Sequence, residues 1–332
     1  MTEHDHTQLT VTVLGASGGV GGAITRELAT RGHTVTAVNR GGDADVPDGV
    51  TRRAGDLRTP EGATEAIGAA DVVVMAAQPP YPQWVSHWPD LIDNVLAGAE
   101  QAGARLVFVD NLYMYAPADG PITEQSPEHA TDRKGALRRQ LGRTLLQAHA
   151  DGRVRVSIGR FSDYYGPRGT NSGLYMTGIS AGLRGKTMRG LIDLNQPHTF
   201  SYLPDAARAF ATLVEQPRAD GQAWILPAAP AITQRELLGL VNAQLPRAVR
   251  LGTVTPAMLW VAGLFNPLIR ETRSVVVQYD RPWVTDSSHF TAVLGPFEVT
   301  PHDEAIAATV AWFSTGACPP APVSGPQPAR TA

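Results

Sequence analysis

Short apolar runs and longer amphipathic stretches alternate along much of the chain. The apolar runs are rich in valine and have the length of strands, whereas the stretches between them repeat their apolar positions with helical spacing. We expect strands at 9–14, 34–38, 50–54, 71–76, 105–110, 153–158 and 224–226, and helices at 21–30, 61–68, 91–102, 132–150, 206–215 and 233–244. Because such alternation builds a parallel sheet with helices on both faces, it predicts an α/β fold with a doubly wound parallel sheet.

Three stretches interrupt this alternation. Residues 81–88 are aromatic and lie among prolines, so we expect a loop there. Beyond residue 168 the sequence is glycine-rich and irregular up to about 197, and the stretch 256–269 is apolar. These later segments indicate a small C-terminal lobe beside the sheet.

Three glycines follow the first expected strand. Gly15, Gly18 and Gly21 stand at the spacing GxxGxxG, which permits a tight turn, an approach of the main chain to a pyrophosphate, and close packing of the next helix on the strand. The N-terminus of that helix would then face the phosphates. An ordinary glycine-rich turn is the alternative on the motif alone, and the surrounding alternation favours the phosphate loop. The expected phosphate-binding residues are Gly15, Ser17, Gly18, Gly19, Val20 and Gly21.

The end of the second strand indicates which dinucleotide binds. An acidic residue there would accept hydrogen bonds from the ribose hydroxyls of NAD, but this sequence has Asn39 and Arg40, which leave room and positive charge for a 2′-phosphate. We therefore expect NADPH/NADP⁺, and a solvated loop arginine is the alternative interpretation of Arg40. Other expected cofactor contacts are Asp56 and Leu57 at the adenine, and Ala76, Ala77 and Gln78 at the ribose and diphosphate.

Composition and charge narrow the function classes. The formal net charge is −3 and the basic residues are scattered, so we expect no nucleic-acid partner. Cys318 is the single cysteine, which excludes an internal disulfide and a multi-cysteine metal site, and we expect no metal. The polar N-terminal residues resemble neither a signal peptide nor a lipid anchor, and no apolar run has the length of a membrane span. These features predict a cytoplasmic protein without a membrane partner.

The expected organisation follows from these segments. We expect a disordered tail at 1–8, an NADP-binding Rossmann domain at 9–165, a substrate-lobe segment at 166–197, a return to the Rossmann domain at 198–226, a C-terminal substrate-binding lobe at 227–315, and a Pro-rich disordered tail at 316–332.

Five ordered motifs resemble the extended branch of the short-chain dehydrogenase/reductase superfamily, which includes sugar-nucleotide epimerases and dehydratases. They are the loop GASGGVG, the adenine-contact motif Gly55-Asp56-Leu57, VDNLYMYAP at 109–117 (similar to SSxxxYG), GRFSDYYGP at 159–167 (similar to RPxNxYGP), and FSYLPDAARAF at 200–210 (similar to F-x-Y-V-x-D-V-A-x-A). The resemblance runs from residue 9 to about 245. It implies a Rossmann domain with a small substrate-binding lobe, and a cofactor contact at Phe161.

The chain departs from this family at the residues that transfer protons. The family carries a catalytic Tyr-x-x-x-Lys pair, and no such spacing occurs here. Alignment on Lys134 puts Ala130 at the tyrosine position, and an alignment on the later helical pattern puts Gly135 there and Arg139 in place of the lysine. Asn111 falls where the family has its catalytic serine or threonine.

Other polar residues are candidates for the missing roles. Asn111 is the expected ligand of the substrate oxygen, and Tyr113 and Asp110 are the first candidates for a substitute acid because they end the strand that normally delivers the catalytic hydroxyl. Lys134 is expected to reach the nicotinamide ribose, with a surface lysine as the alternative. His198 could face the cleft, although a lone histidine is more often structural.

Three functions remain open. The first is an NADPH-dependent ketoreductase whose substrate, an aromatic polyketide ketone, holds the developing charge itself, so that little or no protein acid catalysis is needed. Atypical members of the superfamily that lack the pair, among them angucyclinone ketoreductases of antibiotic biosynthesis, look similar. The second is a nucleotide-sugar epimerase or dehydratase, and the third is a non-catalytic NADP(H) sensor or partner-binding protein. The expected partner of the first is a small aromatic ketone, and the oligomeric state stays open.

Overall fold

The computed structural model describes residues 8–116, 120–273 and 276–315. The tails predicted at 1–8 and 316–332 lie outside these residues except for Gln8, and Cys318 lies outside them too. None of the helices within the described ranges has both the length and the apolar character needed to span a bilayer.

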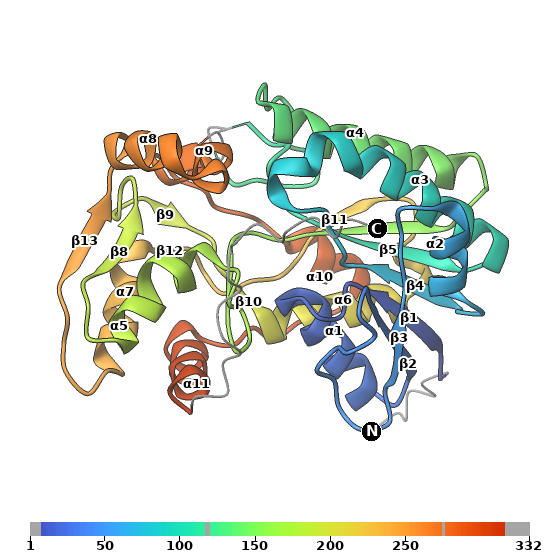
Figure 1. Cartoon of the computed structure of the whole chain (residues 1–332), viewed down its shortest axis with the longest axis horizontal. Helices are drawn as coiled ribbons and strands as arrows, with labels where there is room; N and C mark the ends of the chain where they lie inside the picture. The colour runs from blue at the N-terminus through green and yellow to red at the C-terminus, as the bar shows by residue number, and fades with distance from the viewer. Residues whose placement is uncertain (1–7, 117–119, 274–275, 316–332) are drawn as a thin grey trace, which may run out of the picture.

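A seven-stranded sheet forms the centre of the molecule, with strand order β11-β6-β5-β4-β1-β2-β3 (Figure 1). Every neighbouring pair is parallel. The strands are β1 (Thr10–Leu14), β2 (Thr34–Asn39), β3 (Thr51–Ala54), β4 (Val72–Met75), β5 (Arg105–Asp110), β6 (Val156–Arg160) and β11 (Ala223–Ile225). The predicted doubly wound parallel sheet is confirmed.

Helices cover both faces of this sheet, which explains the continuous valine runs. Val72 and Val74 of β4 point into one core with α1 (Gly19–Thr30), α6 (Leu203–Glu215) and α10 (Ser288–Leu294), whereas Val73 and Met75 point into the other. That second core includes α2 (Pro60–Ile67), α3 (Trp84–Ala102) and α4 (Arg133–Ala150). Successive strand residues face opposite sides, so a strand buried on both faces must be apolar throughout.

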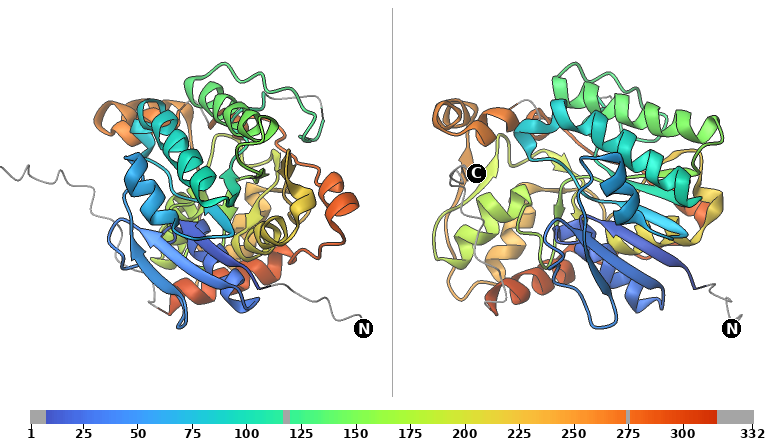
Figure 2. Two further views of the ribbon diagram at one scale, coloured as in Figure 1. Left: turned by 90° about the vertical axis from the view of Figure 1, so that its right-hand side faces the viewer. Right: turned by 45° about the vertical axis from the view of Figure 1, so that its right-hand side comes forward.

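The lobe beside the sheet is built from short elements around a separate core (Figure 2). Its paired strands are β7 (Tyr164–Tyr165) with β10 (Ser201–Tyr202), β8 (Met188–Leu191) with β13 (Leu251–Val254), and β9 (Pro197–His198) with β12 (Ile232–Thr233). Its helices are α5 (Ser180–Leu183), α7 (Gln234–Ala243), α8 (Pro256–Phe265), α9 (Pro267–Thr272) and α11 (His302–Ser314). The lobe also contains the π-helix η2 (Tyr175–Ile179) and the 3₁₀-helix η4 (Val276–Tyr279), whereas the 3₁₀-helices η1 (Tyr81–Gln83) and η3 (Pro217–Ala219) adjoin α3 and α6 of the sheet domain.

Two local findings differ from or qualify the expectations. The prediction of a loop at 81–88 is wrong, because η1 begins at Tyr81 and α3 begins at Trp84. Trp84 and Trp88 stand four residues apart and are both buried, so burial of two indoles on one helix face outweighs the neighbouring prolines. Phe290 of α10 packs with the sheet core, although its residue number falls in the range expected for the lobe. The domain boundaries stay a prediction.

Candidate active site

The glycine loop lies at the carboxyl end of β1, which sits between β4 and β2 in the sheet. Gly15 has a φ of +89°, and a Cβ there would lie 2.4 Å from the main-chain nitrogen of Ala77. A Cβ at Gly21 would lie 2.4 Å from the carbonyl oxygen of Gly15. Both positions therefore require glycine, because the strand, the loop and the helix approach each other too closely for a side chain.

The first turn of α1 leaves main-chain N–H groups available to a ligand. Its N-cap is Gly18, and no side chain caps the helix. Ser17 and Gly18 are exposed, and Gly19 and Val20 are half-buried. Uncapped N–H groups and the positive end of the helix dipole suit a phosphate. The loop also lies where the strand order reverses, the place at which doubly wound sheets bind nucleotides.

Charged side chains gather beyond β2, where the adenosine end of a dinucleotide is expected. Arg40 is exposed. Hydrogen bonds from Arg58, with a smaller contribution from the charge of Arg40, lower the pKa of Asp56 to about 2. Asp43 is an acidic residue that the sequence analysis did not consider. Its Oδ1 accepts a 2.8 Å hydrogen bond from Nδ2 of Asn39. A carboxylate and a guanidinium thus both stand near the expected ribose position.

The other expected cofactor residues lie on two sides of the sheet edge. Ala76 and Ala77 directly follow β4 and pack against the glycine loop, and Gln78 is exposed. Leu57 is buried. Phe161 follows β6 and is also buried, with its ring centroid 5.9 Å from that of Phe210 in an edge-on contact. A contact of Phe161 with the cofactor stays a prediction.

Asn111 and Tyr113 follow β5 at the same edge of the sheet. Oδ1 of Asn111 accepts a 3.0 Å hydrogen bond from the main-chain N–H of Tyr113, which leaves the side-chain NH₂ group of Asn111 to donate to a ligand. Tyr113 is half-buried, and its ring lies 6.1 Å from that of Trp84. Burial, and then the negative charge of Asp163, raise the pKa of the Tyr113 phenol. The phenol is therefore protonated at neutral pH.

Lys134 is buried in the first turn of α4 and reaches the lobe. Its Nζ lies 2.5 Å from Oε2 of Glu271 and donates a 3.1 Å hydrogen bond to the carbonyl oxygen of the same residue. The ammonium also lies 4.7 Å from the centre of the Tyr81 ring. The alternative of a helix-surface lysine is wrong, because the side chain is only 4 % exposed.

Asp110 is held inside the fold by two arginines. Its Oδ1 lies 3.2 Å from Nη1 of Arg138, and its Oδ2 lies 3.3 Å from Nε of Arg160. Arg160 also forms a 2.7 Å ion pair with Glu128 and a hydrogen bond to Tyr115. Both carboxylate oxygens are engaged by buried cations, so the geometry does not favour Asp110 as the proton donor.

His198 pairs with an acidic residue that the sequence analysis passed over. Nε2 of His198 lies 3.0 Å from Oδ2 of Asp163, and Nε2 of Gln278 donates to the same oxygen at 2.8 Å. His198 is buried, and its ring stacks on that of Tyr279. Asp163 stands in the GRFSDYYGP motif, in the short link between β6 and β7, and that position beyond the carboxyl end of β6 was the signal that could have identified it.

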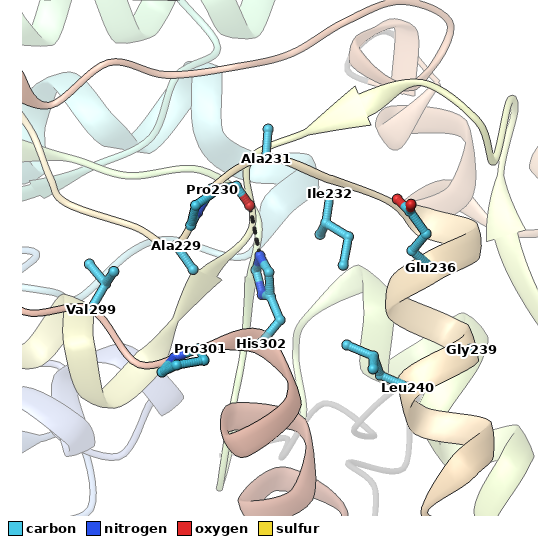
Figure 3. Close-up of a pocket in the computed structure, with 10 residues that line it drawn as sticks. All are labelled: Ala229, Pro230, Ala231, Ile232, Glu236, Gly239, Leu240, Val299, Pro301 and His302. Carbon is cyan, nitrogen blue, oxygen red and sulfur yellow. Dashed lines mark hydrogen bonds between the residues drawn. The ribbon is translucent and has the colours of Figure 1, made fainter.

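A separate cavity of about 660 Å³ lies in the lobe (Figure 3). It is formed by α7, by residues 229–232 and by the start of α11, where His302 bonds to the carbonyl oxygen of Pro230. Leu240 and Val299 make its wall largely apolar, with Glu236 at one side. None of the residues expected to bind the cofactor or the substrate lines it.

These side chains give the sheet edge a defined chemical capacity. The uncapped N-terminus of α1 can hold phosphates. The amide of Asn111 and the phenol of Tyr113 can donate hydrogen bonds to the carbonyl oxygen of a substrate that lies beside them. Hydride transfer itself would be the chemistry of a bound nicotinamide, which the residues of this edge would position.

Comparison with known proteins agrees with this geometry. The model of the NAD-dependent epimerase/dehydratase family matches residues 11–226. Among curated proteins, none matches the chain significantly by sequence.

Several solved structures share the fold. UDP-glucose 4-epimerase of Thermus thermophilus, in complex with NAD, aligns with a TM-score of 0.73 and 20% identity over 93% of this chain and 99% of that one. The dTDP-glucose 4,6-dehydratase DesIV of Streptomyces venezuelae aligns with a TM-score of 0.74 and 18% identity over 92% of this chain and 97% of that one. UDP-glucuronic acid 4-epimerase of Bacillus cereus aligns with a TM-score of 0.76 and 13% identity over 92% of this chain and 99% of that one. The match of the family model to most of the chain shows that the protein belongs to the NAD-dependent epimerase/dehydratase family.

Proposed function

We propose that the protein is an NADPH-dependent ketoreductase that reduces a ketone on an aromatic polyketide. Hydride passes from the cofactor at the glycine-loop side to the carbonyl carbon, and Asn111 and Tyr113 hold the carbonyl oxygen. A substrate whose ketone is conjugated to, or hydrogen-bonded by, an acidic hydroxyl stabilises the developing negative charge itself. The proton then comes from that hydroxyl, from Tyr113 or from water.

The pairing of the cations at the carboxyl edge of the sheet carries the proposal. Lys134, Arg138 and Arg160 bring positive charge to the carboxyl edge of the sheet, and each forms an ion pair with a carboxylate of the protein. A nucleotide diphosphate needs cations that are free to pair with it. Neutralised cations favour an uncharged substrate over a nucleotide sugar.

The half-buried rings of Tyr81 and Tyr113 beside these cations suit a flat substrate. Their centroids lie 4.7 Å and 6.1 Å from that of the buried Trp84, which supports both rings from the core. Rings of this kind stack on other rings in offset or tilted arrangements. The absence of a Tyr-x-x-x-Lys spacing in the sequence points the same way, because a ketone with its own acidic hydroxyl does not need that pair.

NADPH is the proposed cofactor because Arg40 is exposed at the end of β2. Within the described residues no carboxylate forms an ion pair with Arg40, so its guanidinium is free to bind a 2′-phosphate. The negative charge of Asp43 opposes this preference for NADPH. A hydrogen bond from Asn39 holds the Asp43 carboxylate in place.

A nucleotide-sugar epimerase or dehydratase is the second candidate. The family match favours it, as do solved structures with the same fold whose names include UDP-glucose 4-epimerase and dTDP-glucose 4,6-dehydratase. In such a reaction a bound nicotinamide is reused and no net NADPH is consumed.

Cofactor turnover separates these functions. The purified protein is incubated with NADPH and either hydroxylated anthraquinone-like or angucyclinone ketones or UDP- and dTDP-hexoses. Stoichiometric loss of NADPH with an aromatic ketone is the expected result. Sugar conversion without loss of NADPH would overturn the proposal in favour of the second candidate, and tight NADP(H) binding with neither reaction would indicate a sensor.

A further inference from the structure

Asp163 differs from the structural carboxylates elsewhere in this fold. Asp205 is typical of those: it is almost fully buried, and its two oxygens accept hydrogen bonds from Thr300 and Arg208. Asp163 keeps 25% of its side chain exposed, and within the described residues neither a lysine nor an arginine pairs with it. Its partners are a histidine and an amide instead.

The contacts of Asp163 fix the carboxylate but do not occupy all of its hydrogen-bond acceptor positions. His198 and Gln278 are both buried, and both contact Oδ2. The Tyr279 hydroxyl also hydrogen-bonds to the carboxylate, and burial, followed by the charge of Asp163, raises the pKa of that phenol. A carboxylate has about four acceptor positions, so these neighbours leave capacity for a ligand. The partly exposed side chain gives a ligand access to it.

The negative charge of Asp163 acts on two tyrosines at the carboxyl edge of the sheet. It contributes to the raised pKa of Tyr113, and, after burial, to the rise in the pKa of Tyr164 to about 12. Both tyrosines lie at the carboxyl edge of the sheet, after β5 and β6 respectively. A molecule held beside Tyr113 therefore lies within the field of the Asp163 carboxylate.

We propose that Asp163, fixed by His198 and Gln278 at the end of β6, determines substrate specificity by accepting a hydrogen bond from a hydroxyl group of the substrate. The inference rests on the proposed function and narrows it to aromatic ketones that carry a free hydroxyl. A neutral O–H donor gains a charge-assisted bond to the carboxylate. A diphosphate meets like charge there and binds less well.

Binding measurements without hydride transfer test this inference. The NADP⁺-loaded protein is titrated by calorimetry with a hydroxyanthraquinone, with the methyl ether of the same compound, and with UDP. We expect the wild type to bind the hydroxy compound about tenfold more tightly than the ether, the size of one net hydrogen bond to a charged group. Equal affinity for the two compounds in the wild type would overturn the inference.

Two variants assign the preference to this residue. Asp163→Asn keeps the shape and removes the charge, so it should bring the two affinities within about threefold and strengthen UDP binding. Asp193→Asn removes a charge from the exposed turn where Asp193 bonds Asn195 and should retain the wild-type preference. Retention of the preference in a folded Asp163→Asn, judged by its melting temperature, would contradict the inference. If Asp163→Asn does not fold, Gln278→Leu, which frees the carboxylate on one side, should change the preference, and an unchanged preference would contradict the inference.

The outcome also separates this inference from the proposed function. A hydroxyl preference that Asp163→Asn abolishes, without any NADPH oxidation by the same compounds, supports the role of Asp163 and refutes the ketoreductase. NADPH oxidation with no hydroxyl preference refutes the role of Asp163 and leaves the ketoreductase intact.

Discussion

The ammonium nitrogen of Lys134 lies 2.5 Å from Oε2 of Glu271, so an ion pair joins α4 of the sheet domain to α9 of the lobe. The hydrogen bond from Lys134 lowers the pKa of the Glu271 carboxyl, which is therefore ionised at neutral pH. Helix α9 also contacts η1, the segment that carries Tyr81. A nicotinamide ribose that bound Lys134 would have to share the ammonium with Glu271.

Removing the charge of Glu271 should therefore strengthen cofactor binding. Glu271→Gln preserves the size of the side chain and frees the ammonium, and we expect NADPH to bind about two- to fivefold more tightly, because a partly exposed ion pair contributes about 1 kcal/mol or less. Lys134→Ala should weaken binding. Dissociation constants from calorimetry measure both effects, and Glu100→Gln, which removes an exposed pair with Arg153, serves as the control. Identical constants for wild type, Glu271→Gln and Lys134→Ala would exclude a contact between Lys134 and the cofactor.

Arg40 should select NADPH over NADH. A guanidinium contact with the 2′-phosphate is charge-assisted, so Arg40→Ala should weaken NADPH binding by about 10- to 100-fold and leave NADH binding nearly unchanged. Arg153→Ala, an exposed arginine paired with Glu100, is the matched control and should alter neither constant. If the wild type binds the two cofactors equally, Asp43 rather than Arg40 dominates this end of the site and the assignment is wrong.

Gly15 should be essential for the phosphate loop for a reason beyond its backbone angle. Gly15 and Gly32 have φ values of +89° and +84°, but only at Gly15 would a Cβ collide, at 2.4 Å from the nitrogen of Ala77. Alanine at Gly32 should cost about 1 kcal/mol of unfolding free energy and leave cofactor binding intact. Gly15→Ala should abolish detectable NADPH binding. Urea denaturation and calorimetry together distinguish the two, and equal effects of both substitutions would show that strain alone matters.

The glycine loop of the expected cofactor site could be predicted from the sequence because its signals are local. The glycine spacing, the valine runs and the residues after β4 depend on neighbours in the chain, and the structure places Gly15, Gly21 and Ala77 together. The start of α3 was missed, because the burial of Trp84 and Trp88 depends on tertiary packing and outweighs local proline signals.

The substrate side depends on contacts between distant residues, which no local pattern encodes. Lys134 and Glu271 are 137 positions apart, and His198 is 35 positions from Asp163. Sequence reasoning could suggest that His198 faces the substrate, which stays a prediction, but it could not identify the carboxylate that binds its ring. The pairing of Asp110 with Arg138 and Arg160 was likewise invisible, because both arginines come from other elements.

Tyr113 should respond to pH only in the alkaline range. Its raised pKa keeps the phenol protonated, so ionisation of Tyr113 should not affect kcat between about pH 6 and 9 and should lower it only above the ordinary phenol pKa of about 10. Asp163→Asn removes a charge that raises this pKa, so the alkaline fall should move to lower pH. With a substrate that carries an acidic hydroxyl, Tyr113→Phe should retain substantial activity. A loss of about 10⁴-fold in kcat would instead identify the phenol as the general acid.

Isotope transfer tests the central claim most directly. The protein is given NADPH deuterated at the transferring position of the nicotinamide, separately for each face, together with a hydroxylated polycyclic aromatic ketone, and the product is analysed by mass spectrometry. A ketoreductase predicts that one of the two labelled cofactors gives an alcohol with deuterium on the former carbonyl carbon, in a one-to-one ratio with the NADP⁺ formed, and that the other gives unlabelled alcohol. Unlabelled product from both labelled cofactors, or UDP- or dTDP-hexose conversion without NADP⁺ formation in the same assay, would contradict the account.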